Sequence, residues 1–64
     1  METWNEFKDI FNRVKLKVGW VLVILNDGSS YQADSYQILG MKIYLFLNGR
    51  IIGDVQLSDV QSVE

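Results

Sequence analysis

The chain has 64 residues, no Cys, no His and no Pro, and its formal net charge is −2 at pH 7. This length forms one small domain, which we place at residues 1–64. The missing Cys and His exclude disulfides and the usual zinc ligand sets, so stability must come from tight packing or from a partner chain. The absence of Cys fits a reducing compartment, and the longest apolar run, 20–25, is too short for a bilayer, so we expect a cytoplasmic protein without a membrane partner.

Residues 3–16 are predicted to form an amphipathic helix. Thr3 and Glu6 match a capping box, in which the Thr3 hydroxyl accepts a hydrogen bond from the Glu6 amide. Five apolar side chains at spacings of three and four residues share one helix face: Trp4, Phe7, Ile10, Phe11 and Val14.

After Gly19 the sequence pattern changes to that of β structure, over residues 19–64. Residues 20–25 are apolar at every position, which predicts a strand that is buried on both faces. A turn at 26–29 leads to a second strand at 30–39, where the apolar parity switches near Asp34-Ser35 and indicates a bend. The other strands are expected at 41–47, 50–57 and 60–63, with turns at Gly40, Asn48-Gly49 and 57–59.

These elements predict a mainly β fold with one N-terminal α-helix and five short antiparallel strands in a small, strongly bent sheet or barrel. In the fourth strand, alternation places Ile51, Gly53, Val55 and Leu57 on one face. Gly53 marks a bend or a close approach of the backbone to another group.

The segment Leu25-Asn26-Asp27-Gly28, followed by Tyr31 and Ala33, resembles the first motif of the Sm-like barrels, including the bacterial Hfq family. The resemblance implies a helix followed by a bent five-stranded barrel, and an SH3-like barrel of another lineage fits the same layout. Ala33 stands where the family prefers Gly, and the Lys-His pair of Hfq is absent. Both departures weigh against RNA binding of the Sm type. The small net charge also argues against a general nucleic-acid binder, which usually carries a basic surplus, so we expect no general nucleic-acid binding.

The residues that carry most enzyme chemistry are missing. Nucleophilic catalysis needs a nucleophile beside a base, and the chain has neither Cys nor His and no Ser-x-x-Lys arrangement. Its five Gly residues are isolated, so no phosphate-cradling loop is formed, and no calcium-loop spacing occurs. We therefore predict a protein that is not an enzyme and that has no cofactor and no metal site.

Two strands carry more apolar side chains than one short helix can cover. The expected cover is another copy of the chain, since uncovered apolar surface marks interaction sites. The predicted interface of this homo-oligomer consists of Trp20, Leu22, Ile24, Tyr44 and Phe46. The alternative is that helix and barrel cover these strands and that Tyr44 and Phe46 are ordinary surface aromatics.

Aromatic and cationic residues also occur together in the second half of the chain. Planar rings stack on bases, and Lys or Arg pairs with phosphate. A small anionic nucleotide at a subunit boundary would suit a site formed by Tyr36, Lys42, Tyr44, Phe46 and Arg50. The alternative is that aromatics favour strands and that a Lys protects a strand edge.

Three functions remain open. The first is an oligomeric sponge that sequesters a nucleotide signal between subunits, and in size the chain looks like the small phage proteins that evade host immunity in this way. The second is a protein-interaction module or inhibitor of a host protein, docking through a strand edge or the helix. The third is an Sm-like RNA-binding ring. We favour the first hypothesis.

Overall fold

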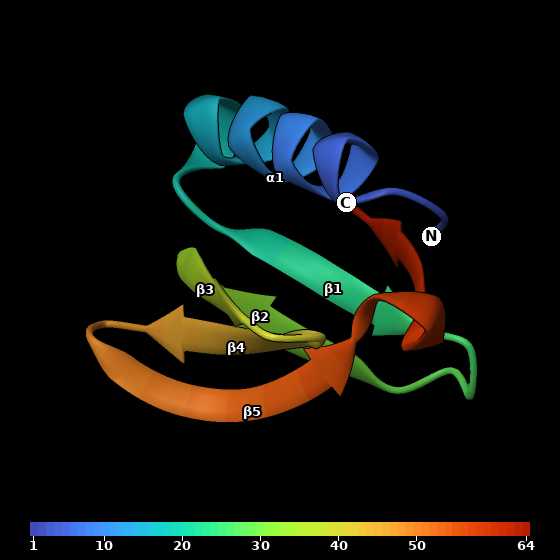
Figure 1. Cartoon of the computed structure of the whole chain (residues 1–64). Coiled ribbons are helices and arrows are strands. Elements are labelled where there is room, and N and C mark those ends of the chain that lie inside the picture. The colour runs from blue at the N-terminus through green and yellow to red at the C-terminus, as the bar shows by residue number, and fades with distance from the viewer.

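The computed structural model describes all 64 residues as one helix and six strands (Figure 1). The helix, α1, spans Trp4–Val18, and no helix of the chain has the length and apolar character needed to cross a membrane. The strands are β1 (Val21–Leu25), β2 (Ser30–Ala33), β3 (Ser35–Leu39), β4 (Lys42–Leu47), β5 (Arg50–Gln56) and β6 (Val60–Val63). A short 3₁₀ turn at Leu57–Asp59 joins β5 to β6.

The strands form two three-stranded antiparallel sheets, ordered β2-β1-β6 and β3-β4-β5. The fold is therefore mainly β with one N-terminal helix, as predicted. The predicted single strand at 30–39 is divided into β2 and β3, because the chain bends at Asp34. There the Asp34 amide donates to the Phe46 carbonyl at 2.8 Å, and its carboxylate accepts from the Asn48 amide at 3.0 Å. These bonds hold the bend that the parity switch indicated.

The helix starts with the predicted cap and runs two residues beyond its predicted end. The Thr3 hydroxyl accepts from the Glu6 amide at 3.0 Å. The helix ends at Gly19, whose φ of 88° is left-handed and whose amide donates to the Lys15 carbonyl at 2.7 Å. A glycine at this position closes a helix at low steric cost, so the end lies at Val18 and not at residue 16.

Ten hydrophobic residues form one buried core between the helix and the two sheets. Phe7 and Phe11 of α1 are fully buried, and both rings contact the ring of Tyr36 on β3, with centroids 5.2 and 4.7 Å apart. The other core residues are Val21, Val23, Ala33, Ile43, Leu45, Val55, Val60 and Val63. The helix lies against β1 and β6, but its aromatic rings also reach the second sheet (Figure 1).

β5 carries a register shift that changes which of its residues face the core. Leu45 pairs with Gly53, whereas the next residue, Phe46, pairs with Ile51, so Ile52 is an extra residue on β5. The predicted alternation from Ile51 to Leu57 is therefore wrong at Ile51, which shares a face with Phe46 and is 61% exposed. A bulge reverses the side-chain parity of the strand beyond it.

Gly53 marks a close approach, as its position in a strand predicts. A Cβ atom at Gly53 would lie 2.7 Å from Cε1 of Tyr31, which belongs to β2 in the other sheet. The Tyr31 ring thus packs directly over the backbone of β5 and joins the two sheets at this point.

Replacing Gly53 with Ala should destabilise the fold by about 1–3 kcal/mol, because the methyl group displaces the Tyr31 ring. Urea unfolding of Gly53→Ala measures this loss. In a Tyr31→Ala background the same change should cost nothing or stabilise, since Ala is better than Gly within a strand by about 0.5–1 kcal/mol. Equal costs in the two backgrounds would show that the ring does not impose the glycine.

Candidate functional site

The outer face of the β3-β4-β5 sheet carries the densest set of aromatic and polar side chains outside the core. Ile43 and Leu45 of β4 are buried, so the alternating residues Lys42, Tyr44 and Phe46 lie on the opposite face. The registers place Tyr44 between Gln37 of β3 and Asp54 of β5. Phe46 lies between Ser35 and Ile51, and Lys42 lies between Leu39 and Gln56. We call these nine residues the outer face.

This arrangement combines flat apolar surface with hydrogen-bonding groups and one cation. Tyr44 and Phe46 are half-buried and adjacent on one face, so their rings offer a surface on which a planar ligand can stack. Gln37 and Asp54 flank Tyr44 with amide and carboxylate groups, which suit the edge of a heterocycle. Lys42 is exposed two residues away and can pair with an anion.

Apolar surface remains uncovered on the outer face. Leu39 at one corner is 56% exposed, and Ile51 at the opposite corner is 61% exposed. Neither the helix nor the other sheet covers them, because both pack on the inner side of this sheet. Tyr44 and Phe46 therefore lie between two exposed aliphatic side chains, neither of which is among the predicted interface residues.

Arg50 stands apart from the centre of the outer face. It is the first residue of β5 and pairs with Leu47, across the Asn48-Gly49 turn, where both φ values are positive (55° and 80°). The Arg50 side chain is exposed at this end of the hairpin. It can approach a ligand that extends past Phe46, but it is not among the side chains in register with Tyr44.

Tyr36 does not belong with the other predicted ligand-binding residues. It pairs with Leu45, a core residue, and its ring lies edge-on against Phe7 and Phe11. The sequence shows a parity switch near Asp34 but not which side of the sheet the switched residues take. The helix decides this, because its two Phe rings pack against the Tyr36 side of the sheet.

The predicted interface residues of the first strand are only partly uncovered. Leu22 and Ile24 are half-buried and face away from the buried residues Val21 and Val23. Trp20 precedes β1 and is 40% exposed. The prediction of a strand buried on both faces is therefore wrong for the single chain, since the helix covers only one of them.

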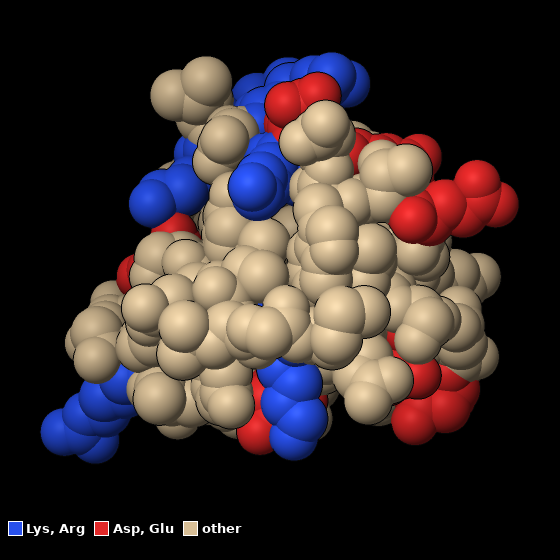
Figure 2. Space-filling view, viewed as in Figure 1, with Lys and Arg blue, Asp and Glu red and all other residues tan.

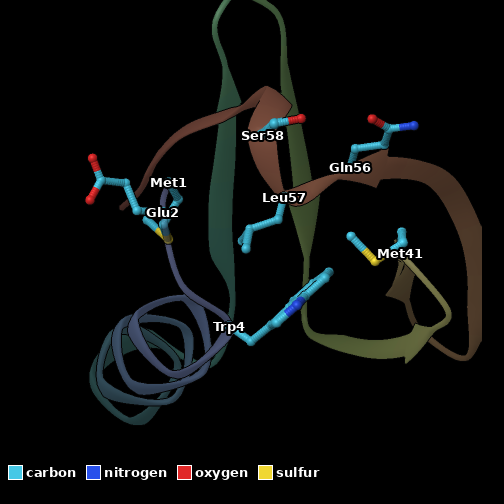
Figure 3. A pocket seen from close by; sticks show the side chains of 7 residues that line it. All are labelled: Met1, Glu2, Trp4, Met41, Gln56, Leu57 and Ser58. Carbon is cyan, nitrogen blue, oxygen red and sulfur yellow. The ribbon is translucent and has the colours of Figure 1, made fainter.

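Two of the three clefts join residues from distant segments of the chain. The first, of about 470 Å³, lies between the start of α1, the β3–β4 turn and the 3₁₀ turn. In Figure 3, Trp4 extends from the helix toward Met41, and Leu57 lies above the Trp4 side chain. Met41 is 74% exposed. The lining residues come from three distant segments, and no sequence signal brings them together: Met1, Glu2, Trp4, Met41, Gln56, Leu57 and Ser58.

The second cleft, which we call the turn cleft, has a volume of about 330 Å³ and an acidic rim. Its lining consists of Leu25, Asn26, Asp27, Tyr31, Asp54, Val55 and Asp59. The Asp27 carboxylate accepts from the Ser29 hydroxyl at 2.6 Å and from the Ser29 amide at 2.9 Å. These hydrogen bonds hold the pKa of Asp27 below its ordinary value, and the bond from the Ser29 hydroxyl has the larger effect. The Asp27 carboxyl is therefore charged at neutral pH.

No protein-family model, no curated protein and no solved structure matches the chain. The outer face and the two clefts are therefore interpreted from their own residues.

Substitutions at Tyr36 and Tyr44 should separate a tyrosine that packs against the core from one that lies on the outer face. Tyr36→Ala should cost about 3–5 kcal/mol, which approaches the whole stability of a domain this small, because it leaves a cavity beside Phe7 and Phe11. Tyr44→Ala should cost about 1 kcal/mol or less. Thermal unfolding followed by circular dichroism measures both, and equal losses would contradict the packing of Tyr36 against the core.

Proposed function

We propose that this protein is an oligomeric binding protein that sequesters a small anionic nucleotide on its outer face, at a boundary between two copies. The observation that carries the proposal is that Lys42, Tyr44 and Phe46 share one face of β4. The strand registers put Gln37 and Asp54 on either side of Tyr44. The rings bind the base by stacking, the flanking polar groups bind its edge, and Lys42 binds the phosphate.

A subunit boundary is favoured by the shape of the outer face. A sheet face is open, so a base stacked on Tyr44 and Phe46 keeps its other side in water, whereas small-molecule sites bury most of the ligand. Leu39 and Ile51 are exposed at opposite corners of the same face. A second copy that covers these two side chains would also cover the ligand between them.

The residues of the outer face favour binding of a ligand over catalysis. The outer face offers one carboxylate, one Lys and one Tyr, and the chain contains no Cys or His that could act as nucleophile or general base near neutral pH. Sequestration needs only affinity, which stacking and a charge pair supply.

A ligand should raise the unfolding temperature, since binding to the folded state stabilises it. We expect a cyclic dinucleotide or adenosine monophosphate, tested separately at millimolar concentration, to raise the midpoint of thermal unfolding by several degrees. Lys42→Ala and Tyr44→Ala should each reduce this rise by more than half, because each removes one of the proposed contacts. Lys8→Ala, which removes an exposed cation from the helix, is the matched control and should keep the full rise.

The two alternative functions predict different results. No rise with any nucleotide, together with capture of one specific host protein, would replace this proposal with that of a protein-interaction module. Oligonucleotide binding that weakens steeply with salt would indicate the RNA-binding alternative.

A further inference from the structure

The last turns of α1 form an apolar projection inside a group of cations. Leu16 is 87% exposed, more than any other large hydrophobic residue of the chain. It lies on the side of the helix opposite the core residues, because 3.6 residues per turn put position 16 about half a turn from positions 7 and 11. Three cations adjoin it in the last turns, and all are exposed. We call the group of Arg13, Lys15, Leu16 and Lys17 the helix-end knob.

The turn cleft has the complementary composition. Its apolar part consists of Leu25, Tyr31 and Val55, and its rim carries three carboxylates, Asp27, Asp54 and Asp59. All three acids are exposed. The cleft volume of about 330 Å³ is that of about ten water molecules, which is room for an aliphatic side chain and the stems of its neighbours.

The knob and the cleft lie at opposite ends of the molecule. In Figure 1 the C-terminal end of α1 is at the upper left, and the β1–β2 turn, which borders the cleft, is at the lower right. Figure 2 shows the same separation in charge, with most Lys and Arg atoms over the helix and its left end and most Asp and Glu atoms along the right side. One copy therefore cannot fill its own cleft, but a second copy can.

We propose that the helix-end knob of one copy docks into the turn cleft of the next copy. Leu16 enters between Tyr31 and Leu25, and the three cations meet the three carboxylates of the rim. The Leu16 contact removes apolar surface from water, and the opposite charges fix the orientation and reject other arrangements. Because the two surfaces differ, the contact is head-to-tail, and its repetition builds a closed ring or an open filament.

This docking would also complete the outer face. Asp54 belongs both to the turn cleft and to the outer face, where it pairs with Tyr44. The cations of the neighbouring copy therefore arrive beside the Tyr44 ring, where they can supplement Lys42 in binding a phosphate. Only this step rests on the proposed function; the docking itself needs no ligand.

Sedimentation velocity over a range of concentrations tests the docking without any nucleotide. The wild-type chain should form species larger than its 7.4 kDa monomer. The double variants Lys15→Glu/Lys17→Glu and Asp54→Lys/Asp59→Lys should each weaken association at least tenfold. A mixture of these two variants should restore it, because the acidic knob of one then meets the basic cleft of the other. Lys8→Glu/Arg50→Glu changes the net charge by the same amount as Lys15→Glu/Lys17→Glu, but away from both surfaces, and should associate as the wild type does.

Three results would overturn the docking. These are a wild-type chain that stays monomeric at millimolar concentration, association that both charge reversals leave unchanged, and reversals that abolish association without rescue in the mixture. Circular dichroism checks that each variant is folded. If a reversal does not fold, the neutral variant of the same surface replaces it, which is Lys15→Gln/Lys17→Gln for the knob and Asp54→Asn/Asp59→Asn for the cleft. A nucleotide-dependent rise in unfolding temperature without association would contradict the docking alone, and association without such a rise would contradict the nucleotide proposal alone.

Discussion

The contact of Phe7 and Phe11 with Tyr36 is the interaction on which the rest of this structure depends. The helix lies against β1 and β6, which belong to one sheet, while Tyr36 belongs to the other. The three rings, with centroids 4.7 to 5.7 Å apart, therefore hold helix and both sheets around one core. A chain of this size without disulfide or metal has few other sources of stability, and aromatic side chains bury more apolar area than any other kind. This contact also fixes the inner side of the β3-β4-β5 sheet, and so determines that Tyr44 and Phe46 lie outside.

Sequence patterns predict most of the secondary structure, because the cap, the turns and the bend are each caused by residues that are neighbours in the chain. The Thr3 cap, the turns at glycine and the bend near Asp34 each depend on a few neighbouring residues. Errors arose where a distant partner decides the outcome. The alternation predicts the wrong face for Ile51, because the bulge at Ile52 exists only in the pairing with β4. Tyr36 does not join the other candidate ligand-binding residues, because the helix, which comes earlier in the chain, decides which side of the sheet faces the core.

The candidate site was predictable only in part for the same reason. Lys42, Tyr44 and Phe46 alternate along one strand, so their common face follows from the strand period. Gln37 and Asp54 join them through strand register, which the sequence does not specify in advance. The cleft beside Trp4 and Met41 depends on three segments that meet only after folding. Sites built on one strand are thus readable from sequence, whereas sites built across strands need the structure.

The distribution of charge has a physical consequence that the net charge of −2 conceals. Four of the six cations lie on the helix, at positions 8, 13, 15 and 17, while Asp27, Asp54 and Asp59 surround one cleft at the other end. A nearly neutral chain with separated charges attracts its own copies in one orientation and repels them in others, and salt screens both effects over roughly 8 Å at physiological ionic strength. In the proposed docking, the exposed Leu16 would add to that one orientation an apolar contact that salt does not screen.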